Sequence, residues 1–230
     1  MAATAGKSKR YSLSRLAPDW RERIFQSIRS ESLKLGVAVL SSTGCRPSEL
    51  ENGIYVNFRE GHLRIAIHGS KVNAGRGQPL RMLTVDVGSA WGKCLVEKIS
   101  QQTEDTILVK YSAAGISQRL REKSREIWPR RKTLVSAYCY RHYIGKSMKE
   151  SGEPADKIAR ALGHASDFSQ HVYGRAGVGK KSTGKHGIID AQATIPVRHS
   201  AKTDRLSRFL NQTGMSPTIP CKYVQLRSRP

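Results

Sequence analysis

The amino-acid sequence predicts a mainly helical α+β fold, in which a small three-stranded antiparallel sheet packs on a helical bundle. Apolar residues recur at helical spacing before residue 44 and after residue 90, which indicates amphipathic helices. Three short runs between residues 54 and 87 instead alternate apolar and polar side chains, as strands with one buried face do. With 230 residues, the chain is long enough to bury a core.

Two helices are predicted before the sheet. Pro18 begins the first and Gly44 ends the second, as these residue types commonly do at helix ends. Both segments repeat apolar side chains every three or four residues: Trp20, Ile24 and Ile28, then Leu33, Val37 and Leu40. A short helical turn is expected next, because Pro47 and Glu49 suit a helix N-terminus.

Alternating apolar residues mark the three strands of the predicted sheet: Ile54, Val56 and Phe58; Leu63, Ile65 and Ile67; Leu83, Val85 and Val87. Glu60 and Gly61 form the turn between the first two strands. The second connection, residues 68–78, reads HGSKVNAGRGQ and is rich in glycine and basic side chains. A loop of this composition can contact DNA phosphates or reach into a groove.

Four helices are expected after the sheet. Ala90–Gln101 and Ala113–Ile127 form the first two. The third begins near Tyr138, Pro154 opens the fourth, and Gly163 ends it. The apolar residues that seat the third helix in a core are Tyr140, Ile144 and Met148.

The segment from Tyr138 to Tyr173 concentrates the chemistry. Arg141 follows Tyr138 by three residues, so a helix places both on one face. His164 comes directly after the glycine that ends the next helix, and Tyr173 follows soon after. An arginine, a histidine and a tyrosine hydroxyl that converge indicate phosphate chemistry. Each residue alone has a common structural explanation, so the interpretation depends on their order and on a second cluster upstream.

That second cluster is the stretch STGCRPSEL, residues 42–50, which resembles the TGxRxSEL box of the tyrosine recombinase (phage integrase) family. Further motifs follow in the order of that family. They are Lys71 within GSKVNAGRG, Tyr138-x-x-Arg141 at the HxxR motif, Leu162-Gly163-His164, and finally Tyr173. The resemblance covers residues 17–175. Its one departure is Tyr138, which stands where the family has a histidine.

The resemblance implies the catalytic-domain fold of tyrosine recombinases and a set of site residues. The catalytic residues would be Arg46, Lys71, Tyr138, Arg141, His164 and Tyr173, with Glu49 in a supporting role. The implied protein is a site-specific recombinase or integrase of a phage or another mobile genetic element. It would cleave and rejoin DNA strands through a covalent 3′-phosphotyrosyl intermediate, without a metal ion or any other cofactor.

The residue types suit that reaction. A tyrosine hydroxyl has a pKa near about 10, so Tyr173 needs positive surroundings or a base to become a nucleophile. Arg46 and Arg141 can each offer a planar fork to the non-bridging phosphate oxygens. His164 can hydrogen-bond the same oxygens or accept the tyrosine proton. The resemblance gives Lys71 the role of the general acid that protonates the departing 5′ oxygen.

The composition indicates a polyanionic partner. The chain has 40 Lys and Arg against 18 Asp and Glu, a formal net charge of +22. Double-stranded DNA is the expected partner, ahead of an anionic membrane surface. No stretch reads as a membrane span or a signal peptide, and four scattered cysteines without metal-ligand spacing suit a reducing compartment. We expect a cytoplasmic protein without a membrane partner, nucleoid-associated when it is bound to DNA.

The expected organisation is a basic flexible arm (1–16), a catalytic domain (17–176) and a basic C-terminal extension (177–230), in which residues 188–197 are a candidate strand. By resemblance, the active assembly is a homotetramer on DNA, with an accessory DNA-bending protein as a further candidate partner. Two other functions stay open. One is a type IB topoisomerase-like activity, and the other is a DNA-binding module with weak or lost catalysis, which Tyr138 in place of histidine favours.

Overall fold

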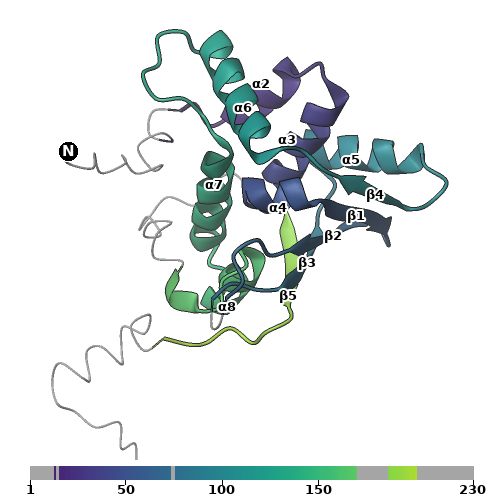
Figure 1. Ribbon diagram of the computed structural model, residues 1–230, viewed down its shortest axis with the longest axis vertical. Coiled ribbons are helices and arrows are strands. Elements are labelled where there is room, and N and C mark those ends of the chain that lie inside the picture. Colours follow the sequence, from purple (N-terminus) through teal and green to yellow (C-terminus); the bar gives the residue numbers. More distant parts are fainter. Residues whose placement is uncertain (1–12, 14–15, 74–75, 170–185, 201–230) are drawn as a thin grey trace, which may run out of the picture.

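The computed structural model describes residues 13, 16–73, 76–169 and 186–200 (Figure 1). Within these residues the chain forms seven helices and five strands. In chain order they are α2 (Trp20–Ser27), α3 (Glu31–Thr43), α4 (Pro47–Asn52), β1 (Ile54–Arg59), β2 (His62–His68), β3 (Leu80–Val85), α5 (Ala90–Ser100), β4 (Thr106–Val109), α6 (Ala113–Ile127), α7 (Ala137–Glu150), α8 (Ala155–Ala161) and β5 (Ile188–Ala193). Nearly all of the expected N-terminal arm and the end of the extension lie outside the described residues.

The helices predicted from apolar periodicity are confirmed. α6 has the predicted bounds, Ala113–Ile127, and the serine before it caps its first turn: Ser112 accepts a hydrogen bond from the Gly115 backbone N–H. α3 ends where expected, because Gly44 adopts a left-handed φ of 62° that other residue types rarely adopt.

The sheet has five strands, so the predicted count of three is wrong. Its order is β4-β1-β2-β3-β5, and all neighbouring strands are antiparallel. The three predicted strands form the centre, and a strand is added at each edge. β4 pairs Val109 with Ile54 of β1, and β5 pairs Ala193 with Arg81 of β3. β5 comes from the stretch expected to be a C-terminal extension, so this part of it folds into the same sheet.

One face of the sheet packs against the helices and forms the core. The inward residues of the three central strands are buried: Ile54, Val56, Leu63, Ile65, Ile67, Leu83 and Val85. The opposite face is open to solvent, where Tyr55 and Met82 are 49% and 39% exposed. At one end of the sheet α8 packs against β3 and β5 (Figure 1). Among the described residues, no helix combines the length and apolarity that crossing a bilayer requires.

Candidate active site

Arg46 is held where two helices meet. α3 ends at Gly44, and Arg46 is the N-cap of α4. Glu49, in the first turn of α4, accepts a hydrogen bond from the backbone N–H of Arg46 at 2.7 Å and pairs with its Nη1 at 2.6 Å. A carboxylate in the first turn also meets the positive end of the helix dipole. The stretch that resembles the recombinase box therefore folds into a local ion pair that fixes the arginine.

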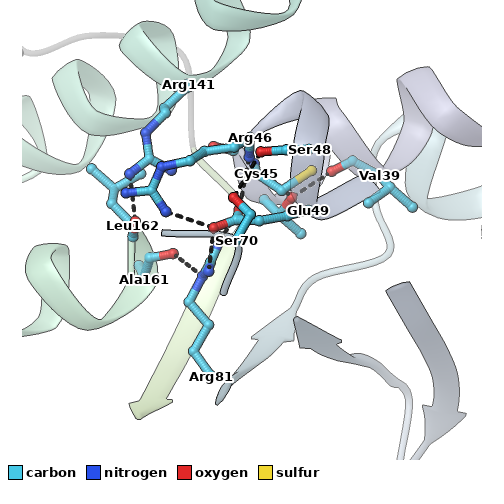
Figure 2. A network of polar contacts seen from close by, with 12 residues as sticks. Val39, Cys45, Arg46, Ser48, Glu49, Ser70, Arg81, Arg141, Ala161 and Leu162 are labelled. Atoms are coloured by element: carbon cyan, nitrogen blue, oxygen red, sulfur yellow. Dashed lines mark hydrogen bonds and ion pairs between the residues drawn. The ribbon is translucent and has the colours of Figure 1, made fainter. Parts of the chain in front are cut away.

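Arg81 of β3 completes this ion pair, although sequence analysis did not single it out. Its Nη1 and Nη2 donate to the two oxygens of Glu49 at 3.1 and 2.7 Å, and both side chains are fully buried (Figure 2). Burial alone would raise the pKa of the Glu49 carboxyl. The charges of Arg81, Arg141 and Arg46 outweigh burial and lower the pKa to about 2. Glu49 therefore stays ionised between two guanidinium groups.

The same arginine ties the sheet to the end of α8. Arg81 Nε donates to the carbonyl oxygen of Ala161 at 3.0 Å. Gly163 lies so close that a Cβ at that position would be 2.6 Å from Arg81 Nη1, and its φ is 64°. One signal in the sequence points to Arg81. It stands two residues before Leu83 and four before Val85, so it lies on the same buried face of the strand. A charged residue on a buried face needs a buried partner.

Arg141 of α7 lies between the carbonyl ends of two other helices. Its Nη1 donates to the carbonyl oxygen of Gly44 at 3.1 Å, and its Nη2 donates to that of Leu162. These residues are the C-caps of α3 and α8, where the helix dipoles place partial negative charge. Arg141 is 3% exposed. It therefore holds two helix ends together beneath the surface.

His164 follows α8 directly and contacts Arg141. The His164 Nε2 lies 3.0 Å from Arg141 Nη2. A guanidinium can only donate, so Nε2 accepts and the ring proton is on Nδ1. Burial, together with the charge of Arg141, lowers the pKa of His164 to about 2. The ring is therefore neutral at physiological pH, which favours hydrogen-bond donation over uptake of a proton.

Lys71 is presented by the connection between β2 and β3. Ser70, just before it, shares a 2.7 Å hydrogen bond between hydroxyls with Ser48 of α4 (Figure 2). Gly77 has a φ of 74°, and a Cβ there would lie 2.1 Å from the carbonyl oxygen of Lys71. The backbone at Lys71 is thus fixed to the helix that begins after Arg46.

These segments line an open cavity of about 380 Å³. Arg46, Lys71 and His164 line it, so the structure brings together three of the predicted site residues. The other described lining residues are Arg76, Gly77, Gly163, Ala165, Ser166, Ser169 and Arg198. Four basic side chains and no carboxylate are among the described lining residues. Such a cavity suits an anion with several oxygen acceptors.

The remaining predicted residues are placed differently. Glu49 and Arg141 lie behind the cavity and contact residues that line it. Tyr138, on the first turn of α7, is 38% exposed and is not among the described residues that line the cavity. Tyr173 lies outside the described residues. In the described part of the chain, no three His, Cys, Asp or Glu side chains gather where a metal ion could be held.

Solved structures with a similar fold are known. The chain is similar to the crystal structure of XerA recombinase, with a TM-score of 0.51 and 20% identity over 69% of this chain and 58% of that one. The crystal structure of XerH site-specific recombinase bound to difH substrate, a pre-cleavage complex, gives a TM-score of 0.49 and 18% identity over 67% and 47%. The chain thus spans about half the length of these proteins.

No known family's sequence model matches the chain, and no curated protein matches it. The likeness in structure establishes the fold: this chain has the catalytic-domain fold of tyrosine recombinases.

Proposed function

We propose that this protein is a site-specific recombinase or integrase that cleaves and rejoins strands of double-stranded DNA. The observation that carries the proposal is the basic cavity in which Arg46, Lys71 and His164 meet on a recombinase fold. These residues come from three separate segments of the chain. A formal net charge of +22 supports a polyanionic substrate.

The proposed reaction is a transesterification at a DNA phosphate. The Tyr173 oxygen forms a bond to phosphorus, and the bond from phosphorus to the 5′ oxygen breaks. The tyrosine loses its proton to solvent water, and Lys71 donates one to the departing 5′ oxygen. Rejoining is the reverse, with a 5′ hydroxyl of the partner strand as the nucleophile. The 3′-phosphotyrosyl bond keeps the energy of the phosphodiester between the two steps.

Arg46 and His164 stabilise the charge that develops on the non-bridging oxygens. Arg46 is held by Glu49 at the rim of the cavity, so its position is set before substrate binds. His164 carries its proton on Nδ1 because Nε2 accepts from Arg141. The Nδ1 atom is buried in this structure, so His164 can donate to a phosphate oxygen only after its ring turns. We assign Arg141 the role of holding that ring beside the cavity.

Tyr173 lies close in sequence to a residue that lines the cavity. Ser169 lines the cavity, and Tyr173 follows it by four residues. Four residues span at most about 14 Å in extended chain. This short connection supports attack by the tyrosine of the same chain. Assembly as a homotetramer on DNA belongs to the same proposal.

The test is a search for the covalent intermediate. A duplex library with 5′-bridging phosphorothiolate linkages is incubated with the protein in EDTA, and adducts are isolated on denaturing gels. We expect a DNA-linked peptide that contains Tyr173 for the wild type and none for Tyr173→Phe. Tyr55→Phe is the matched control, because Tyr55 is a half-exposed tyrosine on the outer face of the sheet; it should form the adduct at the wild-type rate.

Other outcomes identify other functions. Tight, salt-sensitive DNA binding without an adduct on any duplex would make the protein a DNA-binding module. An adduct with relaxation of supercoiled circles, but no joined or excised segments, would indicate type IB topoisomerase-like activity. The library also reports the cleaved sequence, which gives the DNA target.

A further inference from the structure

The segment after β5, residues 194–200, returns to the cavity and is fixed at two places. The first is the start of β3. Thr194 donates to the carbonyl oxygen of Leu80 through its backbone N–H at 3.1 Å and its hydroxyl at 2.6 Å. The buried amide of Gln78 holds the next residue, donating to the Ile195 carbonyl at 2.8 Å and accepting from its N–H at 3.0 Å. Gln78 also donates to the carbonyl oxygen of His164 at 3.1 Å.

The second place is the chain just after His164. The backbone N–H of Arg198 donates to Ala165 O at 2.9 Å, and Asp167 N–H donates to Arg198 O at 3.2 Å. The buried carboxylate of Asp167 accepts from Ser200 N–H at 2.9 Å and lies 2.7 Å from the Nδ1 of His199. Arg198 is thus bracketed by contacts on both sides.

This anchoring places an exposed arginine at the wall of the cavity. Arg198, which is exposed, lines it together with Arg46, Lys71 and His164. An exposed arginine in a basic segment is usually a solvated charge. At Arg198 the backbone is already fixed, so a phosphate contact does not have to order the backbone, which lowers the entropy cost of binding.

We propose that Arg198 is a further phosphate-binding residue of this site, supplied by the chain beyond Tyr173. Its guanidinium donates to a DNA phosphate held in the cavity, together with Arg46. A planar fork suits two oxygens of one phosphate. The inference rests on the proposed function for the identity of the ligand as DNA.

The test compares Arg198→Gln with Arg121→Gln, an exposed arginine of α6 that carries the same charge. Binding to the duplex found in the adduct search, or to any duplex if none is found, is measured by fluorescence anisotropy at several salt concentrations. Loss of one phosphate contact should reduce the slope of log K against log salt by about 1 for Arg198→Gln, relative to Arg121→Gln. Equal slopes for the two variants would overturn the proposal. Arg198→Lys should keep the wild-type slope, because it keeps the charge.

Adduct formation provides the second measurement. Arg198→Gln should slow it about tenfold or more, since a donor to the reacting phosphate is lost, and Arg121→Gln should stay within about twofold of wild type. Thermal unfolding confirms that both variants are folded.

The experiments distinguish failure of the recombinase proposal from failure of the proposal about Arg198. If the wild type forms no adduct, the recombinase proposal falls and the salt slope still decides on Arg198. If the adduct forms equally fast in both variants, Arg198 alone is excluded from the site.

Discussion

Lys71 and Arg76 are two cations of one hairpin, and both line the cavity. Only one of them suits a general acid. A guanidinium keeps its proton at any pH that proteins tolerate, whereas an ammonium can transfer one. This difference supports the choice of Lys71 that the order of motifs predicts.

Lys71→Ala should therefore slow cleavage of an ordinary DNA strand by about 10²–10⁴. The defect should largely vanish on a duplex with sulfur in place of the 5′ bridging oxygen, because a thiolate departs without a proton. Arg76→Ala is the control, and any loss should be equal on both duplexes. Gel-resolved single-turnover cleavage measures both rates. A Lys71→Ala defect that persists on the sulfur duplex would remove Lys71 from the acid role.

The buried pair of Arg81 and Glu49 makes a prediction about stability. Arg81→Met leaves the Glu49 carboxylate buried with one partner fewer, which should lower the free energy of unfolding by about 3–5 kcal/mol. Arg64→Met is the matched control, because Arg64 of the neighbouring strand forms an exposed ion pair with Glu60. It should cost about 0–1 kcal/mol. Urea unfolding compares the two, and equal losses would contradict the assigned role of Arg81.

The neutral state of His164 makes a prediction about pH. Its pKa is about 2 when folded against an ordinary 6.5, so the unfolded chain binds more protons between these values. The contribution of His164 to the free energy of unfolding is therefore fully present above pH 6.5. As the pH falls below 6.5, this contribution decreases by up to about 1.4 kcal/mol per pH unit. Glu49 adds its own loss only below its ordinary pKa of 4.5.

Urea unfolding of wild type and His164→Gln between pH 7 and pH 5 isolates the histidine. We expect the wild type to lose stability more steeply than the variant as the pH falls. Parallel curves for the two proteins would show that His164 is not buried in its neutral form.

At the scale of elements, the hairpin between β2 and β3 depends on a glycine that touches Lys71. Gly77 and Gly61 have nearly equal φ angles of 74° and 76°, so an alanine is strained at either. Only at Gly77 would a Cβ meet backbone, at 2.1 Å from Lys71 O; at Gly61 nothing lies within 4 Å. Comparing alanine substitutions at these two glycines therefore distinguishes the effect of backbone strain from the effect of displacing Lys71.

Gly77→Ala should reduce the rate of DNA cleavage about as much as Lys71→Ala, whereas Gly61→Ala should change stability alone, by about 1 kcal/mol. Single-turnover cleavage and urea unfolding of both variants measure the two effects. Equal cleavage rates in the two variants would show that the position of Lys71 does not depend on Gly77.

The elements that the sequence predicts are those with a strong local signal. Long helices such as α6 and the three central strands show their periodicity over enough residues to be recognised. β4 has four residues and was not predicted. β5 lies within the candidate strand 188–197, but its sequence, IIDAQA, interrupts the apolar pattern with polar residues, and its place in the sheet was not predicted. Both are edge strands, formed because a paired strand already offers free backbone groups. That information is in the tertiary structure, which is why the predicted sheet was too small.

At the scale of the whole molecule, the site also combines residues that a local sequence motif predicts with residues that only the tertiary structure shows. Arg46, Lys71 and His164 lie in motifs with a fixed order, and the fold brings them to one cavity. Arg81 and Arg198 belong to no motif. An arginine is expected at the surface, and the burial of Arg81 is understood only once Glu49 is seen beside it.

The pairing of β5 with β3 also bears on when the site is completed during synthesis. Ala193 pairs with Arg81, and Ile195 with Gln78, across more than a hundred residues of intervening sequence. The motifs up to His164 are all translated before this edge strand exists. A nascent chain can therefore form the helices and the central strands while its cavity still lacks the wall that contains Arg198. Contacts so distant in sequence form later than local ones, because the entropy of closing a long loop opposes them. The wall of the cavity that contains Arg198 is then completed only after the chain has been made through β5 and the segment that follows it.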